Sequence, residues 1–360
     1  MRKSFIYRLS AVALVATALA TTTSCNDWTD SSSLQLHNPS FEEQNPGLYA
    51  DYLKDLRRYK QEEHKLMFVS FDNPAGTPAK QAEHLTDLPD SVDFVCLNNP
   101  DNLSPAVQKE MKEVRDKKGT RTLYRIDYAA MEDAWTAMQK ADPNLTEADA
   151  LDYIAKNVDE QLALCDRYNF DGLIADYTGR STVSMLPAAL AQYDGRQKAF
   201  FGAVTEWRAS HADKTLAFYG NVQYLVPANM GMMDQYDYIM LKTVNSTSEG
   251  DLSLKAYMDI QAGIDAGSDM PDGLNPVPTD RFVACVELPQ ADDKNQVRGY
   301  WNMVGADGGK TLAVLGAAAW MNQESTDFTR EGLFVINAQS DYYNNTYAYV
   351  RKAIGTMNPN

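Results

Sequence analysis

Cysteine is scarce in this chain, with four residues among 360. Cys25 follows an apolar N-terminal segment, and the other three, Cys96, Cys165 and Cys285, show no metal-ligand spacing. An odd number of cysteines in the body of the chain argues against a disulfide framework, and the spacing argues against a zinc site. We therefore expect no metal and no cofactor, and three buried cysteines that act as small apolar side chains.

Basic residues are also few, because 33 lysines and arginines stand against 49 aspartates and glutamates, a net charge of −16. Residues 1–24 hold three of the basic residues and no acidic one, so without them the balance is 30 against 49, or −19. This charge argues against nucleic acid, or an anionic membrane face, as a partner. The charge does not exclude an uncharged ligand such as a sugar.

Long apolar runs are missing after residue 24, so nothing there predicts a transmembrane helix. Before it, a basic start and the apolar segment 11–20 are typical of a signal peptide. The small residues that end at Cys25 are typical of a lipoprotein cleavage site. We predict a signal peptide over 1–24, a lipid on Cys25 and a polar tether over 25–45. The alternative is ordinary cleavage nearby, with Cys25 incidental.

Residues 46–360 show short apolar runs that alternate with helix-like stretches. The helix-like stretches are 46–60, 104–118, 146–168, 193–210, 253–264 and 341–355. The eight apolar runs, expected to be strands, are 67–71, 92–97, 121–126, 172–175, 214–219, 236–241, 281–286 and 312–320. Alternation of strand and helix predicts a parallel sheet. Eight such units predict an α/β fold, a (β/α)8 TIM barrel in a single domain.

Functional residues in such a barrel lie at the C-terminal ends of the strands. The side chains expected there carry amide, hydroxyl, carboxylate and aromatic groups. That set suits carbohydrate, because aromatic faces pack against sugar rings and polar groups bond the hydroxyls. The candidate ligand-binding residues, in chain order, are Tyr128, Asp176, Tyr219, Asn221, Lys242, Glu287 and Trp320.

The fourth predicted strand ends in an acidic motif from which parts are missing. It lies in "FDGLIADYTGRS", residues 170–181. Strand alternation sends Ile174, Asp176 and Thr178 to one face. A glycan-cleaving enzyme built on this strand would need a carboxylate at each of the three places, and only Asp176 supplies one.

The chain resembles the bacterial endo-β-N-acetylglucosaminidases and related lipoproteins of glycoside hydrolase family 18. The resemblance covers nearly the whole chain after the signal peptide and rests on the order and spacing of several segments. They are "CNDWTD" (25–30), "YLKDLRRYKQEEHKLMF" (52–68), "LPDSVDFVCL" (88–97), "VRDKKGTRTL" (114–123) and "YVRKAIGTMNP" (349–359).

The fourth strand of this family ends in Asp-Gly-x-Asp-x-Asp-x-Glu. The first Asp and the Gly are kept here as Asp171 and Gly172, and the third Asp is kept as Asp176. The second Asp has become Ile174, and the Glu has become Thr178. The resemblance therefore implies a motif that has lost two of its four acidic groups.

For intact members the resemblance implies substrate-assisted hydrolysis, in which the N-acetyl oxygen of the sugar attacks the anomeric carbon. An Asp orients that acetamide, and the Glu protonates the leaving oxygen as general acid. The hydroxyl of Thr178 is too weak an acid for this step, and general acid catalysis typically contributes ~10²–10⁴-fold. The family's sixth strand ends in Gln-x-Tyr, and the matching segment 242–244 is Lys-Thr-Val, which lacks those acetamide contacts. We expect no catalytic residue at these positions.

The sequence thus predicts a non-catalytic glycan-binding lipoprotein of a glycan-utilisation system. The resemblance implies ligands that contain N-acetylglucosamine, such as N-glycans, and a place in the outer membrane of a Gram-negative bacterium. There a lipid anchor would hold the protein at the cell surface, beside a glycan transporter complex. One alternative is an active endo-β-N-acetylglucosaminidase in which Glu287 or Asp127 replaces the missing acid. Another is a scaffold subunit of the uptake complex without a glycan site.

Three of the candidate residues also have structural interpretations. Asp176 either accepts a hydrogen bond from the ligand or caps a loop backbone. Lys242 either pairs with Asp176 or is solvated at the rim. Trp320 either forms a platform for a sugar ring or belongs to the core.

Overall fold

The structure is a computed structural model that describes residues 40–268, 273–290, 292–305 and 308–359. The predicted signal peptide, Cys25 and the tether up to residue 39 lie outside these residues. The chain divides into two compact units, 1–51 and 52–360. The described part of the first unit contains α2 (Phe41–Gln44), with a capping box between Ser40 and Glu43, and the first residues of α3 (Pro46–Tyr59).

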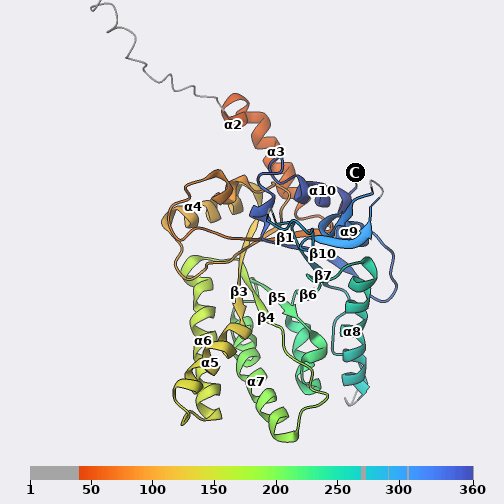
Figure 1. The fold of residues 1–360 in the computed structure, drawn as a ribbon. Helices are drawn as coiled ribbons and strands as arrows, with labels where there is room; N and C mark the ends of the chain where they lie inside the picture. The colour runs from red at the N-terminus through yellow and green to blue at the C-terminus, as the bar shows by residue number, and fades with distance from the viewer. Residues whose placement is uncertain (1–39, 269–272, 291, 306–307, 360) are drawn as a thin grey trace, which may run out of the picture. The chain divides into compact units, whose positions relative to one another are not determined.

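The second unit contains a closed barrel of eight parallel strands in the order β1-β10-β7-β6-β5-β4-β3-β2 (Figure 1). The predicted α/β barrel is confirmed. The strands are β1 (Leu66–Phe71), β2 (Phe94–Leu97), β3 (Arg121–Asp127), β4 (Gly172–Tyr177), β5 (Thr215–Gly220), β6 (Tyr238–Leu241), β7 (Phe282–Glu287) and β10 (Arg330–Ile336).

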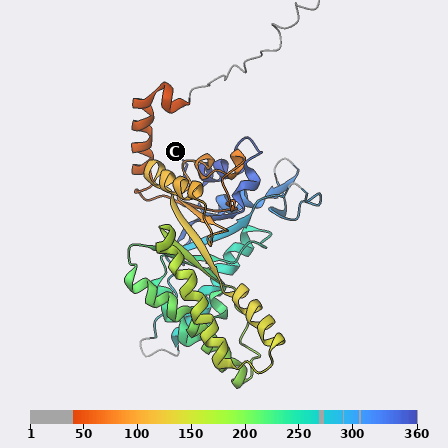
Figure 2. The same ribbon diagram turned by 90° about the vertical axis from the view of Figure 1, so that its left-hand side faces the viewer.

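Helices surround the strands, and Figure 2 shows the yellow-green helices α5 and α6 beside one another on the outside of the barrel. The longer helices after β2 are α4 (Pro105–Glu113), the π-helical η3 (Val114–Lys118), α5 (Tyr128–Ala141), α6 (Glu147–Tyr168), α7 (Pro187–Ser210), α8 (Glu249–Ser268), α9 (Ala313–Trp320) and α10 (Ala348–Met357). The 3-10 helices are η1 (Gln81–Glu83), η2 (Leu85–Asp87), η4 (Val222–Tyr224), η5 (Pro227–Gln235) and η6 (Ala338–Asp341). Helix α5 begins directly after β3, where Asp127 serves as its N-cap.

The inside of the barrel is filled by side chains. The rings of Phe68 and Phe94 stack with centroids 4.3 Å apart. Cys96, Ile174 and Cys285 belong to the same inner cluster, and each is buried. Because this core is packed, the polar side chains that a ligand could reach are expected at the carboxyl ends of the strands, as in other TIM barrels.

The predicted eighth strand over 312–320 is wrong, because this segment forms α9, and the eighth strand is β10. A short apolar run does not distinguish a buried strand from a buried helix by periodicity, and the alanines of this run favour the helix. A hairpin, β8 (Tyr300–Val304) and β9 (Lys310–Leu312), precedes α9 and pairs apart from the barrel. It was not expected from the sequence.

Candidate functional site

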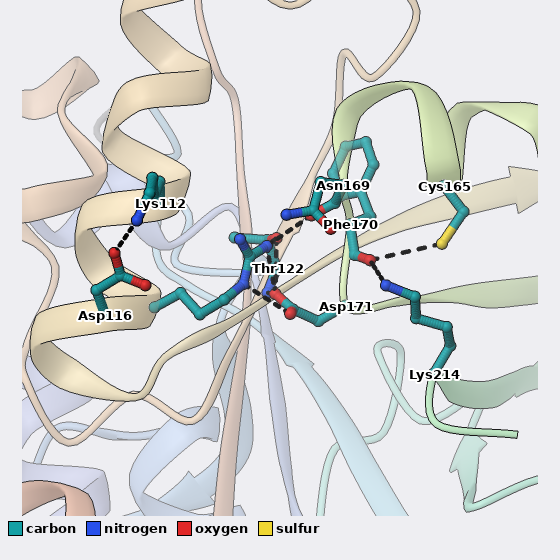
Figure 3. A network of polar contacts seen from close by, with 9 residues as sticks. Lys112, Asp116, Thr122, Cys165, Asn169, Phe170, Asp171 and Lys214 are labelled. Carbon is teal, nitrogen blue, oxygen red and sulfur yellow. Dashed lines mark hydrogen bonds and ion pairs between the residues drawn. The ribbon is translucent and has the colours of Figure 1, made fainter. Parts of the chain in front are cut away.

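The retained first half of the acidic motif lies at the start of β4 and has a structural role. The carboxylate of Asp171 accepts hydrogen bonds from Arg115 Nε at 2.7 Å, from the Thr122 amide at 2.7 Å and from the Thr122 hydroxyl at 3.0 Å (Figure 3). At Gly172 a Cβ would lie 1.9 Å from the carbonyl oxygen of Thr215, so only glycine fits. Both residues therefore act at the amino end of the strand, away from the end where TIM barrels place their sites.

Asp176 lies near the carboxyl end of β4 and is 4% exposed. In the barrel register it is flanked by Asp127 of β3 and Tyr219 of β5. Its carboxylate is paired with two cations, Lys242 Nζ at 3.3 Å and Arg125 Nη1 at 3.4 Å. Burial raises the pKa of the Asp176 carboxyl above its ordinary value, while the two cations oppose that rise.

Lys242 contacts Thr178 and two of the candidate residues, Asp176 and Tyr219. Its Nζ donates to the Thr178 hydroxyl at 2.7 Å and lies 4.3 Å from the centre of the Tyr219 ring, within reach of a cation–π contact. The Asn221 side-chain amide donates to the backbone carbonyl of Thr178 at 2.7 Å. The structure thus brings Lys242, Thr178, Tyr219, Asn221 and Asp176 together. Lys242 pairs with Asp176 and is not a free rim lysine.

The other positions at which the chain departs from the family pattern also face into the barrel. Ile174 is fully buried in the inner core, and Val244 packs against the same cluster. Thr243, between the two inward positions of segment 242–244, is buried, and its hydroxyl bonds the backbone of Cys285, accepting from the amide at 2.7 Å and donating to the carbonyl at 2.8 Å. Of the five motif positions 174, 176, 178, 242 and 244, only 176 therefore carries a carboxylate.

Glu287 ends β7 and is half-buried. The side chain of Gln290 donates to its carboxylate at 3.3 Å. With Val244 it lines a cavity of about 200 Å³, whose other walls come from the loop after β6 and from the hairpin. The structure therefore places Glu287 in the wall of this cavity.

Two predicted ligand-binding residues, Tyr128 and Trp320, are corrected by the structure. Tyr128 is 1% exposed because α5 begins with it and turns its ring outward, where it packs 4.7 Å from the Tyr177 ring. Trp320 lies on a helix rather than on a strand end and is fully buried. Its indole Nε1 donates to Ser253 Oγ at 2.9 Å. Neither ring can stack on a sugar, and both belong to the core between the barrel and its helices.

Arg125 is a residue of this cluster that the sequence analysis missed. It lies on β3, two residues before Asp127, so strand alternation gives the two side chains a common face. Arg125 is not among the candidates because these come from the ends of the predicted strands, and Arg125 lies within β3. Asp127 is held as a helix cap, because its carboxylate accepts from the Ala130 amide at 3.2 Å.

The three cysteines of the barrel are free and buried. Burial raises the pKa of both Cys96 and Cys165 to about 12, so neither thiol is a nucleophile near neutral pH. Among the residues that the structure describes, no helix is long and apolar enough to cross a membrane, and no three His, Cys, Asp or Glu side chains are placed to hold a metal ion.

A closed parallel barrel with a polar cluster at the carboxyl ends of β4, β5 and β6 is the arrangement of the TIM-barrel class. Within that class, the family model for glycoside hydrolase family 18, BT1044-like, matches residues 29–356. The chain belongs to glycoside hydrolase family 18, in its BT1044-like group.

Solved structures agree on the fold. A selenomethionine form of BT1044 with one Glu-to-Gln substitution has a TM-score of 0.60 and 18% identity, with 89% of this chain and 96% of that chain covered. An endo-β-N-acetylglucosaminidase from Cordyceps militaris has a TM-score of 0.58 and 15% identity over 86% and 96% of the two chains. A mutant of that enzyme in complex with fucosyl-N-acetylglucosamine-Asn has a TM-score of 0.56 and 15% identity over 85% and 95%. No curated protein matches the chain.

Proposed function

We propose that this chain binds glycans that contain N-acetylglucosamine and does not cleave them. Membership of glycoside hydrolase family 18 supports a glycan as the ligand. The observation that carries the loss of cleavage is the contact between Lys242 and Thr178, at 2.7 Å. The place where the family carries its general acid holds a hydroxyl, and that hydroxyl accepts a hydrogen bond from the Lys242 ammonium group.

The chemistry of the cluster supports binding over hydrolysis. A general acid must give its proton to the leaving oxygen, and a threonine hydroxyl has no proton of suitable acidity. Asp176, which would orient the acetamide in an intact member, has its carboxylate engaged by Lys242 and Arg125. Ile174, two residues before Asp176 on the same strand face, stands where the family carries a second Asp, so Asp176 has no acidic neighbour there. Hydroxyl and amide groups remain at the strand ends and suit a sugar in its ground state. The Tyr219 ring is 4% exposed and lies under Lys242.

A second candidate function is hydrolysis with a relocated acid, and Glu287 is the residue that favours it. Its carboxylate is half-buried and has one protein partner among the described residues, Gln290. It also lines a cavity. Asp127 is the weaker substitute, because its carboxylate is occupied by the Ala130 amide.

One experiment separates these functions. The purified protein is incubated with high-mannose and complex N-glycoproteins, glycan release is followed by mass spectrometry, and binding of a released high-mannose N-glycan is measured by calorimetry. We expect binding without release. Turnover at about 1 s⁻¹ or faster that disappears in Glu287→Gln would establish the enzyme instead. Neither binding nor release would favour the scaffold subunit.

We also propose that the protein is an outer-membrane lipoprotein at the cell surface, in a glycan-utilisation system with a transporter as partner. The basic start, the short apolar segment and Cys25 support the anchor. Cys25→Ala should abolish acyl labelling and release the protein from the membrane, whereas Cys96→Ala, in the barrel, should label like the wild type. Labelling of Cys25→Ala would reject the site. Protease treatment of intact cells tests the exposure.

A further inference from the structure

A cavity of about 200 Å³ lies beside the polar cluster, between the residues that follow β6 and the β8–β9 hairpin. Its walls join three segments that are far apart in the sequence. The lining residues are Val244, Asn245, Ser246, Thr247, Glu287, Val297, Arg298, Gly299, Tyr300, Asn302, Lys310 and Ala313. Because Val244 also packs against the inner core of the barrel, the cavity adjoins the barrel mouth.

Polar side chains in this cavity have unused bonding capacity. Within the described part of the chain, the side chains of Asn245, Arg298, Tyr300 and Asn302 make no hydrogen bond to the protein. Elsewhere at the mouth the polar groups are already bonded to one another, as Lys242 is to Thr178. Free donors and acceptors on several sides of one small cavity are typical of a ligand site.

The size and composition of the cavity indicate its ligand. Pockets for drug-sized molecules span about 300–1,000 Å³, so a cavity of about 200 Å³ holds one ring. The two asparagines offer donors and acceptors for hydroxyl and acetamide groups. Val244 and Val297 offer apolar surface for an acetamide methyl, and the Tyr300 ring offers a face for the sugar.

The hairpin wall is fixed in place before any ligand arrives. Trp301, between the cavity residues Tyr300 and Asn302, is 1% exposed. Its ring packs so closely on Gly316 of α9 that a Cβ there would lie 2.2 Å from Cζ3. On the opposite strand, Lys310 Nζ donates to the backbone carbonyl of Gln296 at 2.9 Å. A preformed wall lowers the ordering cost of binding.

We propose that this cavity, and not the space above Asp176, is the subsite that holds an N-acetylated sugar ring of the glycan. The inference rests on the proposed glycan-binding function and adds where the ring sits. The glycan then contacts the protein beside the β6 and β7 ends. The Lys242–Asp176 pair stays closed in the complex.

The test compares two ligands and two sets of variants by calorimetry. The ligands are N,N′-diacetylchitobiose and cellobiose, which share their rings and linkage and differ in the acetamides. The double variant Asn245→Ala/Asn302→Ala removes both free amides of the cavity, and Ser246→Trp fills it. The matched control is Asn144→Ala/Asn322→Ala, at two exposed asparagines outside the cavity. Circular dichroism and thermal unfolding show that each variant is folded.

We expect the wild type to bind N,N′-diacetylchitobiose at least tenfold more tightly than cellobiose. Both cavity variants should lose at least tenfold in affinity, and the control should bind like the wild type. If the wild type binds and folded Ser246→Trp and the double alanine variant bind equally well, the cavity is not the subsite, while the glycan-binding function stands. If the wild type binds neither these ligands nor a high-mannose N-glycan, both proposals fall.

Discussion

The ammonium group of Lys242 lies 2.7 Å from the Thr178 hydroxyl and 3.3 Å from the Asp176 carboxylate. A carboxylate placed at position 178 would therefore meet a cation, which favours the ionised form and lowers its pKa. A general acid needs the protonated form near neutral pH. We expect Thr178→Glu to leave the protein without measurable endoglycosidase activity on N-glycoproteins, as judged by mass spectrometry.

The matched variant for this prediction is Thr178→Glu/Lys242→Gln, which removes the cation. Even this variant should stay far below ordinary enzyme rates, because Ile174 and Val244 remain. Recovery of rates near 1 s⁻¹ by Thr178→Glu alone would contradict the role given to Lys242.

Asp171 is predicted to serve stability, not ligand binding. Its carboxylate pairs with Arg115 and accepts from Thr122. The ion pair is largely buried, with side-chain exposures of 24% for Arg115 and 19% for Asp171. Asp171→Ala leaves a partly buried guanidinium without its partner and should lower the free energy of unfolding by about 2–4 kcal/mol. Urea denaturation measures this. The exposed pair Lys112–Asp116, also drawn in Figure 3, is the control, and Asp116→Ala should cost less than about 1 kcal/mol. Equal costs would refute the assignment.

Gly316 is predicted to be required for the packing of the hairpin residue Trp301 against α9. An added Cβ would collide with the Trp301 ring, so Gly316→Ala should destabilise the protein by about 1–3 kcal/mol, the usual cost of overpacking a core. Gly202 on α7 is the control, because an added Cβ there meets nothing within 4 Å. Gly202→Ala should stabilise slightly, by up to about 1 kcal/mol, through helix propensity. Thermal or urea unfolding of the two variants distinguishes a close contact from a general effect of alanine.

Asp259 on α8 gives a pH dependence with a defined sign. It is fully buried beside Lys255, 3.0 Å away, and burial raises its pKa to about 6. An unfolded aspartate has a pKa near 3.9, so the folded state holds this proton more tightly. The stability that this adds is complete below about pH 4 and is lost as the pH rises through about 6. The free energy of unfolding of the wild type minus that of Asp259→Asn should therefore fall over this range.

The measurement is urea unfolding of both proteins at several pH values between about 4 and 7. The difference in the free energy of unfolding between the two proteins separates the effect of Asp259 from that of the other carboxyl groups. Parallel curves would show that the pKa of Asp259 is the same in the folded and unfolded states. Lys255 also bonds the side chain of Gln223 at 2.6 Å, so the same pair ties α8 to the loop after β5.

The sequence allowed the barrel to be predicted because most of its strands are short buried runs between clear helices. It failed at 312–320, where alanines and a single apolar run are compatible with either element. That error moved Trp320 to a strand end and left the hairpin with Tyr300 and Asn302 unseen. Contacts between distant strands, such as Arg125 with Asp176, follow from barrel register and not from local pattern. A Lys242–Asp176 pair was one of two alternatives for Lys242, because both positions were assigned to strand ends on the same rim, and the structure has the pair.

The hairpin between β7 and α9 bears on how such a protein could change its ligand. Among the described residues, its two strands pair with each other and not with the barrel, and its Trp301 packs on Gly316 of α9. Replacing its other residues while keeping Trp301, which belongs to the main core, would alter one wall of the cavity and leave the pairing of the eight strands unchanged. This wall can therefore vary in sequence at little cost to the barrel.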